Sequence, residues 1–300
     1  MALWKIDMTH NPHPLAQRET ASVVVDGVPV TYHSAGQDDG RRGDAQRPVL
    51  VMVHGSTGST DSHYGFLFPM LGFRQRVVSV DLAQPLTDAL SLAQLVAQVG
   101  AVIDVVRGQS GGRPVSLMGY SLGAVVAASL AAQRPDAVRD LILVAGWMKT
   151  DAHQRLRNGI WRQLRQADLA TIRDYMLYCA FSPDFIAART PQELEGMAAK
   201  IGLDAFVDQQ MALNAEIDIA AQVPLIEART LVVGCTHDQM VPRAHSQQLF
   251  GAIDDARYTQ IDSGHGVVFE RPAELLRHID AFLRQPAAHP AGSVIPTARP

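Results

Sequence analysis

Cysteine and long apolar runs are scarce in this chain of 300 residues. Its two cysteines, Cys179 and Cys235, have no C-x-x-C partner and no histidine cluster around them, so the sequence indicates neither a disulfide framework nor a zinc site. No apolar run reaches the roughly 18 residues that a membrane span requires. The first 20 residues also lack a signal-peptide pattern. We therefore expect a soluble protein of the reducing cytoplasm, with no membrane partner.

Blocks of like charge are absent as well. The formal net charge is −4 at pH 7, and the acidic and basic residues are interspersed. Such a sequence has no cluster of basic residues of the kind that binds the phosphates of nucleic acid. The hydroxyl-rich turn at 56–60 lacks the G-K-[ST] ending of a phosphate-binding loop, and no G-x-G-x-x-G follows a strand. The sequence therefore indicates no nucleic-acid partner, no cofactor and no metal, and favours a site for a small molecule.

Apolar patterning indicates strands that alternate with helices. A hairpin is expected around Asp26-Gly27, and buried strands are expected at 48–55, 76–81, 114–119, 141–146, 230–235 and 257–262. Apolar residues at helical spacing lie between them, at 90–106, 122–133 and 272–283. This alternation predicts an α/β fold with a mostly parallel, eight-stranded sheet that is flanked by helices.

The alternation is interrupted once along the chain. Between about residue 147 and residue 223 the strand-like runs vanish, and amphipathic helical stretches replace them. An insertion of this length is too long for a plain loop and is typical of a lid. We therefore predict an N-terminal arm (1–21), a core (22–146 and 224–284), a helical cap (147–223) and a disordered tail (285–300) that is rich in Pro, Ala and Gly.

Residues suited to nucleophilic chemistry follow three of the predicted strands. Ser121 lies between two glycines after one strand, and Asp238 and His265 follow two later strands. Parallel strands end at the same edge of a sheet, where the sites of such folds lie. A serine hydroxyl is a weak nucleophile until a base removes its proton, and a histidine held by a carboxylate can be that base. The order therefore predicts a nucleophile, a base and an orienting acid.

This pattern resembles the α/β-hydrolase superfamily, in its serine-nucleophile branch with a helical cap. The resemblance covers residues 22–284 and rests on G-x-S-x-G at 119–123, on the His54-Gly55 turn upstream and on the Ser, Asp, His order. It implies an α/β-hydrolase fold and a catalytic triad of Ser121, His265 and Asp238. It also implies an esterase-like, thioesterase-like or lactonase-like activity.

The resemblance further implies an oxyanion hole and a neighbouring pocket. The backbone N–H groups of Leu122 and Ser56 match the family's oxyanion-hole positions. His54 is interpreted as a structural hydrogen bonder beneath that loop, and His63 either lines the pocket or covers it. Candidate substrate-binding residues beside these positions and at the start of the cap are Thr57, Tyr64, Trp147 and Met148.

Each catalytic assignment has a structural alternative. Ser121 could be the N-cap of the helix that follows it. His265 could be a solvated loop histidine. Either Asp81, after the fourth strand, or Asp262, three residues before the histidine, could orient the ring in place of Asp238. Strand-end position favours Asp238.

The implied chemistry is acyl transfer on an ester, thioester or lactone of a small to medium apolar substrate. After the fourth strand, residues 81–88 read DLAQPLTD, without the arginine and glycines of the family's D-x-R-G-x-G-x-S loop, which disfavours epoxide hydrolases and dehalogenases. Two alternatives stay open. One is a lyase or cyclase that uses the same triad, for example to eliminate acetate in polyketide tetronate tailoring. The other is a noncatalytic receptor for a small ligand. The oligomeric state also stays open.

Overall fold

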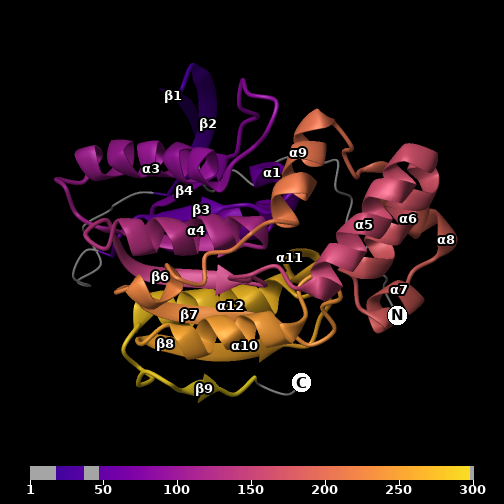
Figure 1. The fold of residues 1–300 in the computed structure, drawn as a ribbon. Coiled ribbons are helices and arrows are strands. Elements are labelled where there is room, and N and C mark those ends of the chain that lie inside the picture. Colours follow the sequence, from indigo (N-terminus) through magenta and orange to yellow (C-terminus); the bar gives the residue numbers. More distant parts are fainter. Residues whose placement is uncertain (1–17, 37–46, 298–300) are drawn as a thin grey trace.

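A nine-stranded sheet forms the centre of the computed structural model, which describes residues 18–36 and 47–297 (Figure 1). The strand order is β1-β2-β4-β3-β5-β6-β7-β8-β9. The pairs β1/β2 and β2/β4 are antiparallel, and every other pair is parallel. The strands are β1 (Glu19–Val25), β2 (Val28–Ala35), β3 (Leu50–Val53), β4 (Val77–Asp81), β5 (Val115–Tyr120), β6 (Val138–Val144), β7 (Arg229–Cys235), β8 (Ala256–Ile261) and β9 (Val294–Ile295).

Helices cover both faces of this sheet. The first apolar core lies under α3 (Leu92–Gln109), α4 (Leu122–Gln133) and α10 (Arg243–Ala252). The second lies under α1 (Thr60–Tyr64), α2 (Leu67–Gly72), α11 (Val267–Glu270) and α12 (Pro272–Arg284). Within the described ranges, no helix is both long enough and apolar enough to cross a bilayer. The predicted architecture of a mostly parallel sheet between helices is thus confirmed.

The insertion between β6 and β7 is a group of helices beside one end of the sheet (Figure 1). Asp151, Thr190 and Asp204 accept hydrogen bonds from backbone N–H groups at the starts of α5, α8 and α9, so local capping sets where these helices begin. The elements of the insertion are α5 (Ala152–Ala167), α6 (Leu169–Ala180), α7 (Pro183–Ala187), α8 (Pro191–Ala199), α9 (Ala205–Asn214) and the short 3-10 helix η1 (Val223–Leu225).

The two chain ends differ from the sequence prediction. The expected disordered tail at 285–300 is ordered through residue 297, and it adds β9 to the open edge of β8, which makes nine strands rather than eight. An edge strand offers unpaired backbone groups, so a short segment can join it despite a composition rich in Pro and Gly. At the other end β1 begins at Glu19, inside the predicted arm. Residues 1–17 of that arm and 298–300 of the tail lie outside the described residues.

The hairpin expected around Asp26-Gly27 is confirmed by the antiparallel pairing of β1 with β2. Asp26 and Gly27 both have positive φ, at 48° and 81°, as a two-residue hairpin turn of the mirror-image type requires. Cys179 and Cys235 are buried free thiols.

The turn from β5 to α4 is closely packed against neighbouring backbone. A Cβ atom on Gly123 would lie 2.1 Å from the carbonyl oxygen of Val53, and one on Gly119 would lie 2.1 Å from the carbonyl oxygen of Gly123. The first turn of α4 therefore rests directly on the end of β3. Only glycine allows the backbone to approach this closely. The close approach fixes Ser121, which lies between the two glycines, at the edge of the sheet.

We expect Gly123→Ala to lower the free energy of unfolding by about 3 kcal/mol or more, because the added methyl group overlaps backbone that cannot move aside. Urea denaturation followed by circular dichroism measures the change. Gly108→Ala in α3 is the matched control, since its Cβ meets no atom within 4 Å. The control should gain up to about 1 kcal/mol from better helix propensity. Equal stability of Gly123→Ala and the native protein would contradict this account of the turn.

Candidate active site

Three strand ends bring a serine, a histidine and an aspartate into one hydrogen-bonded chain. The hydroxyl of Ser121, after β5, donates to Nε2 of His265, after β8, at 2.9 Å. Nδ1 of the same ring donates to Oδ2 of Asp238, after β7, at 2.7 Å. A carboxylate only accepts hydrogen bonds, so it selects the tautomer that leaves Nε2 free to accept from the serine. The arrangement has the geometry of an activated nucleophile.

Ser121 has a strained backbone. Its φ of 56° lies in the left-handed region that favours glycine. Ser121 occupies the N-cap position of α4, but its side chain makes no capping hydrogen bond to that helix, so its hydroxyl does not serve as a helix cap. Strain of this kind persists only where the surrounding structure imposes it, and here it turns the hydroxyl toward His265.

Asp238 is held as an acceptor by the turn after β7. Its Oδ1 accepts from the backbone N–H groups of Met240 at 2.9 Å and Val241 at 2.7 Å, while its side chain is fully buried. These bonds leave Oδ2 for the histidine.

The two alternative aspartates have other partners. Asp81 accepts from Thr60 and pairs with His33, and Thr60 and His33 together hold the pKa of Asp81 below its usual value despite the opposing effect of burial. Asp262 pairs with His237 at 2.9 Å and is largely exposed. Neither is bonded to the ring of His265.

The turn after β3 lies against Ser121. A Cβ on Gly55 would lie 2.8 Å from the Cβ of Ser121, so the backbone of residues 55 and 56 passes directly beside the serine. Leu122 is the first residue of α4, where backbone N–H groups lack partners within the helix. His54 lies beneath the turn: its Nδ1 donates to the Gly55 carbonyl at 2.8 Å, and its Nε2 accepts from Leu82 at 3.0 Å. His54 is thus a structural hydrogen bonder, as expected.

Helix α9 of the cap holds this same turn. The backbone N–H of Thr57 donates to Oε1 of Gln210 at 2.9 Å, and Nδ2 of Asn214 donates to the hydroxyl of Ser56 at 2.9 Å. Thr57 has a φ of 64°, a conformation that is costly for a branched residue. The cap therefore does more than cover the cavity, because it holds a strained turn beside Ser121.

The loop that carries His265 is also tied to its surroundings, through residues that the sequence did not single out. The hydroxyl of Tyr120 donates to the His265 carbonyl at 2.9 Å. Glu270 accepts from the backbone N–H groups of Gly264 and Ser182, both at 2.9 Å, and from the Ser182 hydroxyl at 2.7 Å. Because Ser182 belongs to the cap, one carboxylate joins the cap to the histidine loop.

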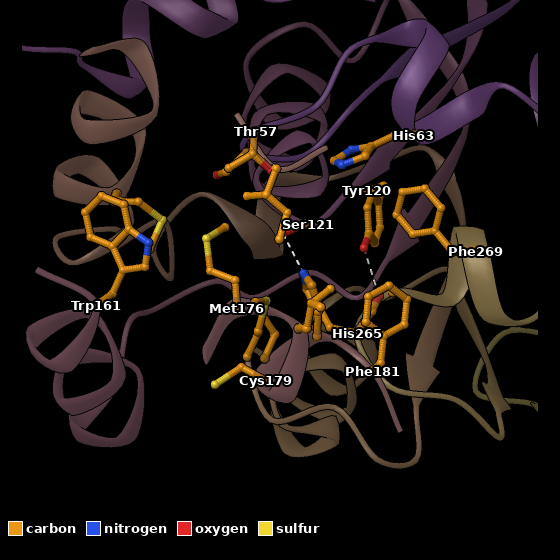
Figure 2. A pocket seen from close by; sticks show the side chains of 18 of the residues that line it. Thr57, His63, Tyr120, Ser121, Trp161, Met176, Cys179, Phe181, His265 and Phe269 are labelled. Atoms are coloured by element: carbon orange, nitrogen blue, oxygen red, sulfur yellow. Dashed lines mark hydrogen bonds between the residues drawn. The ribbon is translucent and has the colours of Figure 1, made fainter. Parts of the chain in front are cut away.

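A cavity of about 320 Å³ lies in front of Ser121, between the core and the cap. Of the predicted substrate-binding residues, Thr57 and Trp147 line it, together with His265 and with Ser56 of the predicted oxyanion hole. Ser121 lies between two sides of the cavity that are formed by different side chains (Figure 2). His63, Tyr120 and Phe269 lie on one side, and Met176 and Trp161 lie on the other. His63 therefore lines the pocket, one of the two positions that the sequence left open for it. The sequence did not assign the other four side chains or Arg157, which also lines the cavity.

Two of the predicted substrate-binding residues lie elsewhere. Tyr64 is fully buried in the core beneath the sheet, where its hydroxyl donates to the Val53 carbonyl at 2.7 Å. Met148 packs against the other core and does not line the cavity; its carbonyl accepts from the Ile219 N–H at 2.7 Å. Both residues were assigned to the pocket because they are close in sequence to other site residues. The local backbone instead turns their side chains toward the core.

Burial keeps the imidazoles beside the site neutral. It lowers the pKa of His54 below the usual value. It lowers the pKa of His63 to about 3, and the nearby imidazoles of His54 and His265 add to this effect because a second cation beside them is unfavourable. Nδ1 of His63 accepts from the Gly55 N–H at 3.3 Å, which is consistent with a neutral ring whose proton sits on Nε2. Among the described residues, no group of three or more His, Cys, Asp or Glu side chains could hold a metal ion.

Comparison with known proteins gives a consistent set of relatives. A family model described as "Alpha/beta hydrolase family" matches residues 50–278. Pyrrolizixenacetamide deacetylase of Xenorhabdus hominickii is 31% identical over 254 residues, which are 80% of this chain and 92% of that protein. The putative carbamate hydrolase RutD of an Escherichia coli strain is 27% identical over 260 residues, with coverage of 80% and 93%.

A solved structure shares the fold. The enol-lactonase of Burkholderia xenovorans superposes with a TM-score of 0.72 at 21% identity, over 88% of this chain and 99% of that one. At this level of identity the likeness concerns the fold alone.

The buried histidines make the stability of the fold depend on pH. Their pKa values are lower in the folded chain than in the unfolded chain, so the unfolded state binds more protons below about pH 6.5. The free energy of unfolding should therefore fall between pH 6.5 and pH 5, by up to about 2 kcal/mol for each fully shifted imidazole. Denaturant titrations across this range measure it. His63→Gln should make the slope shallower, and a slope that stays the same in that variant would contradict the assignment.

Proposed function

The chain belongs to the α/β-hydrolase family and is an enzyme of that family, and from this premise we propose that it is a serine hydrolase that cleaves an ester, thioester or lactone through an acyl-enzyme. The observation that carries the proposal is the continuous hydrogen-bonded chain from Asp238 through His265 to Ser121 at the wall of a cavity. The small volume of that cavity favours a small to medium substrate.

In the first step Oγ of Ser121 attacks the acyl carbon of the substrate while Nε2 of His265 takes the hydroxyl proton. The carbonyl electrons move onto oxygen, and Asp238 stabilises the imidazolium that has formed. The backbone N–H groups of Leu122 and Ser56 donate to the new oxyanion. The hydrogen bonds from α9 to residues 56 and 57 support this role, because they hold the turn that carries one of the two donors.

The tetrahedral intermediate then collapses, and the bond between the acyl carbon and the leaving group breaks. His265 gives its proton to the departing oxygen or sulfur. In the second half-reaction a water molecule attacks the acylated Ser121, with the same histidine as base. The products are a carboxylic acid and the free alcohol or thiol, or a single hydroxy acid where the substrate is a lactone, so atoms and charges balance without a cofactor.

The names of the relatives help to choose the first acyl groups to test. A relative named as a deacetylase favours acetyl derivatives, and one named as a putative carbamate hydrolase favours small carbonyl compounds. The aromatic wall formed by Tyr120, Phe181 and Phe269 suits an apolar part of the substrate. A panel of p-nitrophenyl esters and acyl thioesters, extended to N-acetyl compounds, covers these classes.

Ser121→Ala should lower turnover on such a panel by at least about a thousandfold, since it removes the nucleophile. Steady-state kinetics on the native enzyme and the variant measure the change. A fluorophosphonate probe should label the native enzyme on Ser121 and leave the variant unlabelled. Unchanged turnover in Ser121→Ala would end the proposal.

The alternatives give different results in the same experiments. Hydrolysis places oxygen from labelled water in the released acid, whereas a lyase forms a new double bond without incorporating that oxygen. A noncatalytic receptor neither turns over the panel nor reacts with the probe. Mass spectrometry of the products therefore separates all three.

Gln210→Leu tests the link between the cap and the oxyanion turn. Loss of the acceptor for Thr57 should loosen the turn and lower kcat by about 10- to 100-fold, with KM changed much less, because the oxyanion forms only in the transition state. Gln209→Leu is the matched control on the same helix, since Gln209 donates to the carbonyls of Thr87 and Asp88 rather than to the turn. Equal kinetics of the two variants would contradict the link.

A further inference from the structure

Helix α5 turns two side chains with buried, unpaired N–H groups toward the catalytic cavity. Arg157 and Trp161 are one helical turn apart, so they share a face of α5, and both line the cavity that contains Ser121. Figure 2 shows Trp161 on the cap side, with Met176 lying between it and His265. We call these two residues the α5 donor pair.

Each member of the α5 donor pair has a buried N–H group without a hydrogen-bond partner within the described ranges. In the part of the chain that the structure describes, Nε of Arg157 and Nε1 of Trp161 are buried without a hydrogen bond. Trp161 as a whole is 4% exposed. The guanidinium makes one bond through Nη2, to Oδ1 of Asn158 at 2.6 Å, and among the described residues it forms no ion pair with a carboxylate. Burying hydrogen-bond donors without partners costs free energy, which indicates that a bound ligand accepts hydrogen bonds from them.

The other charges at the cavity wall do not neutralise this arginine. Lys200 also lines the cavity and adds positive charge from its exposed end. Among the described residues that line the cavity, the acidic one is Asp61, and it pairs with Arg18. Burial lowers the pKa of Arg157, and the opposing effects of Cys179, Tyr175 and Asp238 offset this only in part. A guanidinium nevertheless stays charged in proteins.

The chemistry of the donor pair determines which group of a ligand it can bind. Guanidinium and indole groups donate hydrogen bonds and cannot accept them, so the matching ligand group carries acceptors only. A positive charge in a partly desolvated site further selects a negative group, and a carboxylate with two oxygens fits a guanidinium fork. By contrast, the wall formed by Tyr120, Phe181 and Phe269 is aromatic. The cavity therefore has one end for an anion and one end for an apolar group, with Ser121 between them.

We propose that the α5 donor pair binds a carboxylate of the substrate, so that the preferred substrates are acyl compounds that carry a carboxylate remote from the scissile bond. This inference rests on the proposed acyl hydrolase function and names the substrate class for it. The donor pair is a specificity element: it holds the substrate by one end and presents the acyl carbon to the serine.

Matched substrate pairs test the inference. One series consists of mono-p-nitrophenyl esters of linear dicarboxylic acids of increasing length, and the other of O-acetyl derivatives of linear hydroxycarboxylic acids. Each acid is compared with its own methyl ester, so only the charge changes. In at least one series we expect kcat/KM to favour the acid by at least about tenfold at the best chain length.

Variants of the donor pair then locate the effect. Arg157→Gln should lower kcat/KM for the preferred acid by about 10- to 100-fold and change the methyl ester by less than about twofold. Arg157→Lys should give an intermediate loss, because it keeps the charge and loses the fork. Trp161→Phe should cost the acid about 3- to 10-fold through the missing N–H. Arg162→Gln, at an exposed position on the same helix, is the control and should match the native enzyme.

The contrary outcomes are distinct from a failure of the proposed function. Methyl esters that equal or exceed their acids at every length in both series would overturn the inference, as would an Arg157→Gln variant that loses both substrates equally. If no ester is hydrolysed and the probe does not label Ser121, the proposed function fails, and calorimetric binding of the acids decides the inference separately. Binding that Arg157→Gln abolishes supports the carboxylate site, and binding that is absent or unchanged in that variant overturns it.

Discussion

The hydrogen bond between Asp238 and His265 is the interaction on which the rest of the site depends. It selects the tautomer of the ring and so makes Nε2 an acceptor for the serine hydroxyl. Three parallel strands must end at the same edge of the sheet for this bond to form, and the glycine-lined turn after β5 must bring Ser121 to within 2.9 Å of the ring. The sheet places the three side chains together, and the buried carboxylate of Asp238 sets which ring nitrogen of His265 carries the proton.

The cap is joined by hydrogen bonds to the turn at residues 56 and 57 and to the loop that carries His265. Helix α9 holds the strained turn at Thr57 through Gln210, and Ser182 shares the carboxylate of Glu270 with the histidine loop. A movement of the cap that broke either contact would also displace the turn at residues 56 and 57 or the loop that carries His265. Under the proposed function, access to the cavity and the geometry of the catalytic groups are therefore coupled.

Much of this could be predicted from the sequence, because buried parallel strands are continuous apolar runs and their ends are marked by Gly, Ser, Asp and His. The position of Ser121 followed from such a strand end. The assignments of Tyr64 and Met148 to the pocket failed, because chain adjacency does not determine which way a side chain points. Arg157 and Trp161 could not be assigned at all, since the inward face of a cap helix depends on packing against segments distant in the sequence.

Direct detection of the covalent intermediate is the measurement that tests the central claim most directly. The enzyme is mixed with an activated acetyl ester, quenched in acid within the first turnover and digested for peptide mass spectrometry. The account predicts an acetyl group on the peptide that contains Ser121, appearing before steady-state product and absent in Ser121→Ala. Product formation without an adduct on Ser121, or with the adduct on another residue, would contradict it.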